Sequence, residues 1–183
     1  MNLVAFSGSL RSASLNTGVV RTVAELGPAL GVTTTVYPDL GRLPYFDQDR
    51  ESSGPPVEVL EFRALLAGAD AVLISSPEYA HGTSGVLKNA LEWVVGGGEL
   101  VDKPLAVVTA SPSMTGGDRA QAWLSETLAV MGARVIPESL PIPLASAKIK
   151  DGRVTDPVTL DALRGVVEAL RKSAAETGTV PWT

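Results

Sequence analysis

The sequence carries the stretch Gly8-Ser9-Leu10-Arg11-Ser12-Ala13-Ser14-Leu15-Asn16 between an apolar run at residues 3–6 and a long segment with helical apolar periodicity. A buried strand that leads through a small, hydroxyl-rich loop into a helix is typical of the first unit of an α/β protein. The first N–H groups of such a helix have no partner within it, and the helix dipole places positive charge there. The stretch therefore predicts an anion site, suited to phosphate, where the helix begins.

Four side chains in this stretch strengthen the phosphate interpretation. Ser9, Ser14 and Asn16 can donate hydrogen bonds, and Arg11 adds a permanent cation. The competing interpretation is that Ser14 or Asn16 only caps the helix, as such residues often do. One residue is enough for a cap, so the combination of all four favours phosphate binding.

Length and composition predict one globular domain over residues 1–183, because 45% of the residues are hydrophobic and 19% are charged. No apolar run approaches the roughly 20 residues that span a bilayer, and the N-terminus lacks the basic region of a signal peptide. The chain has no cysteine, which excludes disulfides, a thiolate nucleophile and cysteine metal ligands. We therefore expect a cytoplasmic protein that does not associate with a membrane.

The charge balance bears on the kind of ligand. With 15 basic and 20 acidic residues the chain has a formal net charge of −5, and it contains no basic run. Such a surface is a poor match for the phosphate backbone of a nucleic acid. One arginine in a loop can still serve a single phosphate, so the charge balance favours a small ligand.

Apolar, β-branched runs alternate along the chain with helical segments, which is the pattern of a parallel sheet with helices on both faces. The sequence predicts strands at 2–7, 32–37, 69–74, 105–110 and 134–137, and helices at 15–30, 57–67, 85–95, 118–131 and 156–175. Residues 38–56 are expected to form a long irregular connection, and connections of that length are usually functional or mobile. Five parallel strands in this arrangement suit a doubly wound α/β fold, a three-layer sandwich with the strand order 2-1-3-4-5.

That strand order brings the loops after the first, third and fourth strands to one edge of the sheet, where such folds bind ligands. The loop after the third strand offers the aromatic ring of Tyr79 beside Pro77, and Gly82 allows close approach of the main chain. The loop after the fourth strand exposes main-chain amides through Gly116 and Gly117. A planar heteroaromatic ring with a phosphate tail matches this combination.

These loops resemble those of the NADPH-dependent FMN reductase family. The stretch 8–16 is similar to the family's phosphate loop, and its flavin loop and following helix are similar to Ser76-Pro77-Glu78-Tyr79 and Gly85-Val86-Leu87-Lys88-Asn89-Ala90-Leu91-Glu92-Trp93. The family's third loop is similar to Gly116-Gly117-Asp118-Arg119-Ala120-Gln121. The resemblance spans residues 3–137, and the three motifs are specific in combination, because they occur in order and at the family's spacing.

The resemblance implies a flavodoxin-like fold with bound FMN and with NADPH or NADH as co-substrate. It assigns the phosphate to the serines, the arginine and the asparagine of the first loop, the ring to residues 77–79, and the pyrimidine edge to Gly116. The cofactor-binding residues that it predicts are Ser9, Arg11, Ser14, Leu15, Asn16, Pro77, Glu78, Tyr79, Ala80, Ser111 and Gly116. It implies no catalytic side chain and no metal, since hydride transfer belongs to the cofactor.

By the same resemblance, the chain is expected to be an NAD(P)H-dependent FMN or quinone reductase. It would pass a hydride from a nicotinamide through flavin to a quinone, free flavin, an azo compound or a metal oxyanion. Ping-pong kinetics follow if donor and acceptor use the same open face of the ring. Members commonly form dimers or tetramers, so the resemblance also implies a homodimer or homotetramer.

Two positions depart from the family pattern. Many members have Asn after the Pro-Glu-Tyr triplet, where this chain has Ala80 and then His81, and many have Pro where this chain has Ser84. His81 either donates a proton to the flavin or only contacts main chain or a neighbouring subunit. We expect Glu78 to turn outward or to pair with a cation, because a lone carboxylate beside the flavin is unfavourable.

Further side chains carry narrower expectations. We expect Trp93 in the core or at an interface, and Arg119 at a partner subunit or at the 2′-phosphate of NADPH. The acidic residues at 47, 49 and 51 lack the pattern of a calcium loop, so a solvated acidic loop is favoured over a metal site. Tyr45 and Phe46, in the same connection, are expected to cover the mouth of an active site, either that of this chain or that of a neighbouring subunit.

A different class of function remains open. A flavodoxin-type one-electron carrier would also bind FMN, and it would dock to redox partner proteins. Such carriers tend to be more acidic and to flank the ring with aromatic side chains, whereas this chain has a net charge of −5 and no tryptophan in the flavin loops. A regulatory module without flavin is a third interpretation, against which the intact phosphate loop argues.

Overall fold

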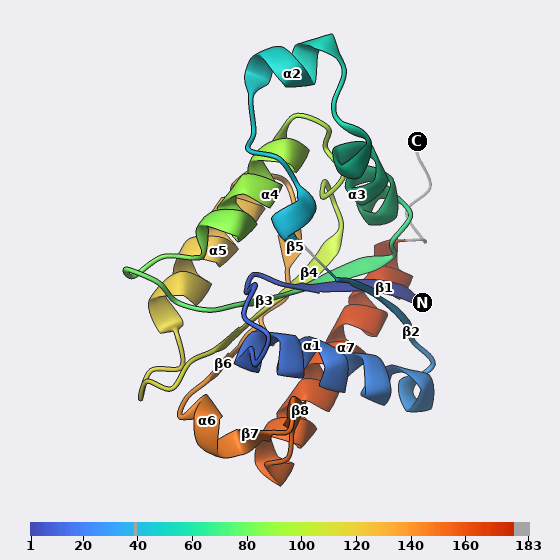
Figure 1. The fold of residues 1–183 in the computed structure, drawn as a ribbon. Helices are drawn as coiled ribbons and strands as arrows, with labels where there is room; N and C mark the ends of the chain where they lie inside the picture. The colour runs from blue at the N-terminus through green and yellow to red at the C-terminus, as the bar shows by residue number, and fades with distance from the viewer. Residues whose placement is uncertain (39, 178–183) are drawn as a thin grey trace.

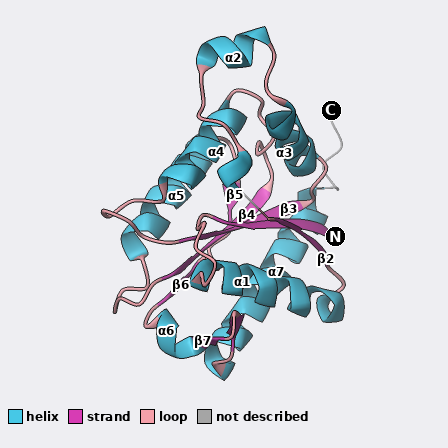
Figure 2. Ribbon diagram, viewed as in Figure 1, coloured by secondary structure: helices cyan, strands magenta, loops and turns pink. Residues whose placement is uncertain are grey.

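The computed structural model describes residues 1–38 and 40–177. Its centre is a parallel sheet formed by β1 (Asn2–Ser7), β2 (Thr33–Tyr37), β3 (Ala71–Ser76), β4 (Pro104–Ala110) and β5 (Arg134–Val135). The strand order is β2-β1-β3-β4-β5, which confirms the predicted topology (Figures 1 and 2). β3 and β4 are buried along their whole length, because they lie in the middle of the sheet and helices cover both faces.

Two layers of helices enclose this sheet (Figure 1). On one face lie α1 (Leu15–Leu26) and α7 (Pro157–Thr177). The other face is covered by α3 (Val57–Ala67), α4 (Gly85–Val95) and α5 (Asp118–Val130). The predicted three-layer arrangement is thereby confirmed.

The side chains of strand β1 pack alternately into the cores on the two faces of the sheet. Leu3 and Ala5 point into the core under α1 and α7, whereas Val4 and Phe6 point into the opposite core, as the two-residue period of a strand requires. Phe6 meets Phe62 of α3 edge to face, with 5.6 Å between the ring centroids. Full burial of a side chain of this size stabilises the fold by about 1.5–3 kcal/mol.

The edge beside β4 differs from the prediction of one strand at 134–137. β5 covers only Arg134–Val135, and a sixth strand, β6 (Leu140–Ile142), pairs with the other end of β4. Pro137 has no N–H to donate to a ladder, and between the two short strands the Ser139 hydroxyl accepts the N–H of Val107 at 3.1 Å. The sheet therefore has six strands where five were predicted.

Some predicted boundaries of helices and strands also shift. The first helix ends at Leu26 and continues as a 3-10 turn, η1 (Gly27–Leu30), since Pro28 cannot donate the N–H that an α-helix needs. β3 runs to Ser76 rather than to residue 74, because Ser75 and Ser76 pair with β4 although they read as loop residues. Helices 57–67 and 85–95 are found at the predicted residues.

The connection after β2 is more ordered than predicted. It contains η2 (Leu40–Arg42) and α2 (Gln48–Ser53), and Asp47 caps α2 by accepting the N–H of Asp49 at 2.9 Å. Asn89 of α4 accepts the N–H of Phe46 at 2.8 Å, and Trp93 donates to the carbonyl of Pro44 at 2.8 Å. These contacts attach the connection to α4.

Residues 145–154 form structure that the sequence analysis did not predict. They contain α6 (Ala145–Lys148) and a hairpin of β7 (Ile149–Lys150) and β8 (Arg153–Val154). Thr22 of α1 accepts the N–H of Val154 at 2.9 Å, which attaches the hairpin to the first helix. Across the described ranges, each helix is too short or too polar to cross a bilayer.

Candidate functional site

The loops that follow β1, β3 and β4 meet at the carboxyl edge of the sheet, on the left in Figure 1. Together they form a cleft that contains nine of the eleven predicted binding residues. The cleft is lined by Ser9, Arg11, Ser14, Leu15, Asn16, Pro77, Glu78, Tyr79, Ala110, Ser111 and Pro112. Ala80 and Gly116 lie outside this lining, and Ala110 and Pro112 were missed although they flank the predicted Ser111.

The first loop leaves its hydroxyl groups able to donate. Ser14 is the N-cap of α1, and its Oγ accepts the N–H of Thr17 at 3.1 Å. The Oγ of Ser9 accepts the N–H of Arg11 at 3.4 Å. Each hydroxyl acts here as an acceptor, so its own hydrogen remains available for an anion in the cleft. Both predictions for Ser14, a helix cap and a group facing the ligand, are compatible with this geometry.

Arg11 is exposed at the rim of the same loop. Within residues 1–38 and 40–177, its guanidinium forms no hydrogen bond or ion pair with another side chain. A guanidinium carries five N–H donors and a full positive charge at any ordinary pH. The rim of the cleft therefore presents a cation that the protein itself does not neutralise.

Asn16 is the residue that joins the three loops. Its side chain is buried, and its Oδ1 accepts the hydroxyl of Ser75 at 2.9 Å and the N–H of Ala110 at 3.1 Å. Its Nδ2 donates to the carbonyl of Ala110 at 3.1 Å. One N–H of this amide is left for a ligand, since an amide nitrogen has two. The side chain thus ties the start of α1 to the ends of β3 and β4.

The second loop closes in a tight turn next to the cleft. Tyr79 and Gly82 exchange two main-chain hydrogen bonds, of 3.0 and 2.9 Å. The two residues between them, Ala80 and His81, have φ angles of 50° and 62°. Asn and Gly are favoured in such a left-handed turn, which gives a physical reason for the asparagine of the family at position 80. His81 is highly exposed there, with 76% of its side chain accessible.

Ser84, the second departure from the family pattern, has a clear structural role. Its hydroxyl accepts the N–H of Leu87 and so caps α4. The same hydroxyl donates to the carbonyl of Gly8 in the first loop. The serine thereby connects the first loop to the helix that follows the second, which a proline at this position could not do.

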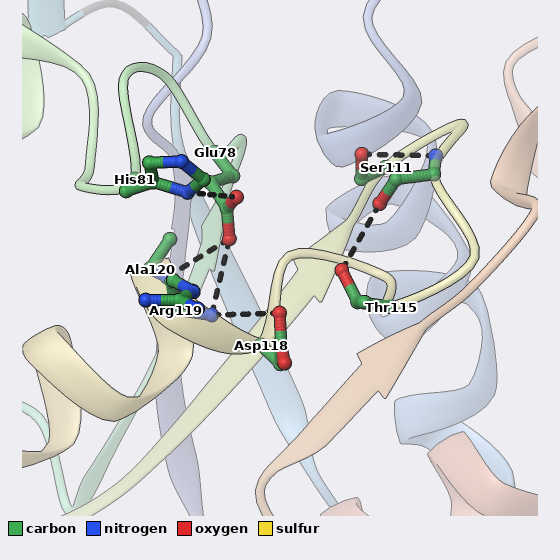
Figure 3. Close-up of polar contacts among 8 residues, drawn as sticks. Glu78, His81, Ser111, Thr115, Asp118, Arg119 and Ala120 are labelled. Atoms are coloured by element: carbon green, nitrogen blue, oxygen red, sulfur yellow. Dashed lines mark hydrogen bonds and ion pairs between the residues drawn. The ribbon is translucent and has the colours of Figure 1, made fainter.

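Glu78 corrects an expectation from the sequence. Its side chain is only 18% exposed, so it does not turn outward. Its Oε2 accepts the N–H groups of Arg119 and Ala120, both at 3.1 Å, and its Oε1 lies 3.6 Å from Nδ1 of His81 (Figure 3). The carboxylate thus bonds mainly to the N-terminus of α5 rather than to a cation.

The third loop depends on two glycines in left-handed conformations. Gly116 and Gly117 have φ angles of 70° and 90°. A Cβ on Gly116 would lie 2.6 Å from the main-chain nitrogen of Pro143, so the residue has to be glycine for the loop to pack on this segment. Leu144 donates its N–H to the carbonyl of Ser113 at 2.9 Å. The packing of residues 142–144 against this loop was not predicted, because no local pattern in the sequence links them to it.

Two aromatic expectations have different outcomes. Trp93 is fully buried, which confirms its place in the core. Phe46 packs edge to face on Trp93, with 5.0 Å between the ring centroids, and does not line the cleft. Tyr45 is 88% exposed. Two of the acidic residues nearby have structural roles, since Asp47 caps α2 and Glu51 lies 3.6 Å from Arg63.

A larger cavity lies elsewhere on the molecule. It is a groove of about 430 Å³ between α4 and α5, and most of its lining is apolar. Its one cation, Lys88, is already paired with Glu92. The smaller cleft at the sheet edge, with its free hydroxyls, guanidinium and helix N-terminus, is therefore the better candidate for an anionic ligand.

The chain is similar in sequence and in structure to known proteins over most of its length. The chain is 32% identical to a quinone reductase of Escherichia coli K12 over 175 residues, which cover 92% of this chain and 93% of the relative. It is 31% identical to an NAD(P)H-dependent FMN reductase of Pseudomonas aeruginosa, over 93% and 94% of the two chains. The solved structure of FerB, a flavoenzyme NAD(P)H:acceptor oxidoreductase from Paracoccus denitrificans, superposes with a TM-score of 0.82 at 30% identity, covering 96% and 97% of the chains.

The fold class is confirmed independently by a more distant structure. An archaeal flavodoxin superposes with a TM-score of 0.64 at 12% identity, covering 96% of this chain, a likeness that concerns the fold alone. The sequence profile of the NADPH-dependent FMN reductase family matches residues 1–147, which include all three loops of the cleft. With four-fifths of its sequence matched in this way, the chain belongs to the NADPH-dependent FMN reductase family.

Proposed function

We propose that this chain binds FMN in the cleft and uses it to pass reducing equivalents from NADPH or NADH to a quinone. An NAD(P)H-dependent flavin or quinone oxidoreductase is the activity that family membership and the relatives support. The observation that carries the proposal is the cleft itself, where the hydrogen-bond donors of the first loop meet the loop after β3, which we call the ring-side loop. Free flavin and azo compounds, which also accept two electrons, are further acceptors in this proposal.

The donor set of the first loop fits the phosphate of FMN. The hydroxyls of Ser9 and Ser14 keep a hydrogen to donate, Arg11 supplies an unpaired cation, and the N-terminus of α1 adds main-chain N–H groups. Leu15 and Asn16 begin the helix at the same place, and Asn16 retains one N–H. A dianionic phosphate needs such a set, whereas a neutral ligand would leave the cation without a partner.

The second and third loops would hold the flavin ring. We assign this role to Pro77, Glu78, Tyr79 and Ser111, which line the cleft. The main chain of Ala80, next to Tyr79, and of Gly116, further along the third loop, completes the assignment. FMN, when bound, supplies the hydride chemistry, so the protein needs no acid–base side chain of its own. The chain's task is to fix the ring, to exclude water from one face and to leave the other face open.

Self-association is part of the proposal, as a homodimer or homotetramer. The groove between α4 and α5 is bordered by exposed apolar side chains, among them Val95, 59% exposed, and Val130, 86% exposed. Lys88 and Glu92 provide charges of both signs along the same groove, so a second copy related by a two-fold axis could match it. Burial of these residues in an interface would remove this apolar groove from water.

Residues 1–183 are proposed to form a single FMN-binding domain in the cytoplasm, where pyridine nucleotides are available. The decisive experiment measures flavin absorbance of the purified protein and its oxidation of NADPH and NADH with and without a benzoquinone. We expect a bound flavin spectrum and quinone-dependent turnover. A one-electron carrier would bind FMN but would show no such turnover without a partner protein.

The kinetic form of the reaction can be tested in the same assay. If nicotinamide and quinone use the same open face, they have to alternate, and double-reciprocal plots at several quinone concentrations should be parallel. Intersecting lines together with a demonstrated ternary complex would contradict this part of the proposal.

A further inference from the structure

Helix α5 begins without a capping side chain of its own. Its N-cap is Gly117, with a φ of 90°, and a Cβ at this position would lie 3.2 Å from Cβ of Thr109. The residues that usually cap helices are therefore disfavoured by both conformation and space. Asp118 reaches only the N–H of Arg119, at 3.0 Å. The N–H of Ala120, in the first turn, depends on an acceptor from elsewhere in the fold.

Glu78 supplies that acceptor from the loop after β3. Its Oε2 accepts the N–H groups of both Arg119 and Ala120 at 3.1 Å, and Figure 3 shows the carboxylate lying over the first turn of α5. Glu78 also lines the cleft, so one carboxylate faces both the helix end and the candidate ligand site. The charged groups around it are Asp118 and Arg119 on α5, and the titratable imidazole of His81 lies on its own loop.

We propose that Glu78 is a positioning residue that locks the ring-side loop onto α5 and offsets the positive end of that helix. A carboxylate at a helix N-terminus cancels the partial charge that the N–H groups present there. Two N–H groups that could otherwise stabilise negative charge in the cleft are then occupied. The second part of this inference rests on the proposed function, because it concerns bound FMN.

The electrostatic consequence follows from the direction of electron flow. Adding electrons to a bound flavin increases the negative charge in the cleft, which a nearby carboxylate opposes and an uncapped helix end favours. Glu78 therefore keeps the midpoint potential of the bound flavin more negative than the α5 terminus alone would. A more negative potential favours delivery of electrons to the acceptor over their retention.

The positioning role can be tested without flavin. Amide hydrogen exchange of Arg119 and Ala120, followed by NMR in the flavin-free protein, should be at least about tenfold faster in Glu78→Ala, the change expected for loss of one hydrogen bond. Glu78→Asp keeps the charge but shortens the side chain, so it should also accelerate exchange. Glu78→Gln keeps an acceptor and should stay near the wild type. Unchanged exchange of Ala120 in both Glu78→Ala and Glu78→Asp would overturn the inference.

Asp118→Asn is the matched control, because it removes a charge from the same turn and leaves the hydrogen bonds from α5 to Glu78 in place. Asp118→Asn should accelerate hydrogen exchange at the amide of Arg119 at most, and the amide of Ala120 should stay protected. If Ala120 exchange accelerates as much in this control as in Glu78→Ala, the protection does not come from Glu78. That result would overturn the proposed link between the ring-side loop and α5.

The charge role is measured by potentiometric titration of FMN-loaded protein. Glu78→Gln should shift the midpoint potential to a less negative value, equivalent to about a three- to tenfold rise in the affinity for reduced over oxidised FMN. The more exposed Asp118→Asn should shift it less. An unchanged potential in Glu78→Gln would overturn the charge role. If the wild type binds no FMN, the proposed function and the charge role both fail, whereas the exchange experiment still decides whether Glu78 bridges the loops.

Discussion

Arg11 is the cation that decides which part of a ligand the first loop can hold. Because the Arg11 guanidinium is exposed at the rim of the cleft and supplies charge rather than packing, its removal should leave the fold intact. We expect Arg11→Ala to weaken FMN binding by about 10- to 100-fold, as charged hydrogen bonds contribute roughly 1.5–3 kcal/mol. Titration with FMN and with riboflavin, which lacks the phosphate, measures the effect. Equal losses for both ligands would contradict the phosphate role.

Asn16 differs from Arg11 in that its side chain is buried and holds the loops together, so its removal should affect stability. Asn16→Ala would leave Ser75 and both main-chain groups of Ala110 without their partner. We expect the free energy of unfolding to fall by about 2–4 kcal/mol, because each unsatisfied buried group costs roughly 1–3 kcal/mol.

The same two ligands separate the role of Asn16 from that of Arg11. The affinities for FMN and riboflavin should both fall in Asn16→Ala, as the ring-side loops lose their connection to the first loop. If only FMN binding is weakened and the unfolding free energy stays near the wild-type value, the amide serves the phosphate alone.

The turn at Ala80 and His81 carries backbone strain that substitutions can relieve. Both residues have left-handed φ angles, which cost about 1 kcal/mol for a residue with a Cβ. We expect His81→Gly to raise the free energy of unfolding in urea by about 0.5–1 kcal/mol. Ala147→Gly, at an exposed helical position, is the control and should lower it. A destabilised His81→Gly protein would indicate that the imidazole near Glu78 contributes more than the strain costs.

At the scale of elements, α7 contains a cap whose strength depends on pH. Asp156 accepts the hydroxyl and the N–H of Thr159, at 2.6 and 2.8 Å, and these hydrogen bonds lower the pKa of Asp156 below its usual value of 3.8. The unfolded chain therefore takes up the proton first as the pH falls. The stabilisation is complete above about pH 4 and is lost as the pH drops through the lower pKa of the folded state.

Urea unfolding of the wild type and of Asp156→Asn at several pH values tests this cap. The wild type should be the more stable protein at neutral pH, and the difference should shrink below pH 4 as the carboxylate is protonated. A difference that stays constant down to pH 3 would show that the charge of Asp156 does not contribute to the cap.

The helices were predicted more accurately than the edges of the sheet, for physical reasons. The helices at 57–67 and 85–95 could be predicted from local apolar periodicity and from their flanking residues. The break between β5 and β6 depends on pairing with β4, and the connection that contains α2 is held to α4 through Phe46 and Asn89. These partners in β4 and α4 are distant in sequence, so local patterns do not reveal them.

At the scale of the whole molecule, the groove between α4 and α5 is the surface through which we expect two copies to associate. Val130→Glu should disrupt this association, because Val130 is 86% exposed in the single chain and a buried unpaired carboxylate is costly. Analytical ultracentrifugation should show a smaller species than the wild type. Val158→Glu, at a position 78% exposed on α7, is the control and should not change the mass. Identical masses for the two variants would contradict an interface at this groove.

The sequence by itself determined the doubly wound topology, the three loops and most of the residues that line the cleft. Strand patterns, helix caps and the small-residue loop are local features, and parallel crossover topology then leaves few arrangements of the elements. The composition of the phosphate loop could likewise be interpreted from its own residues.

Only the tertiary structure decided what several of these residues do. Asn16 turns out to join three loops, and Glu78 to cap a helix that begins 40 positions later in the chain, at residue 118. Gly116 has to be glycine because of the main chain at residues 142–143. In each case the partner is remote in sequence, and a buried or strained group takes its role from the atoms packed against it. The sequence states which chemical groups are present, whereas the fold alone determines which of them meet.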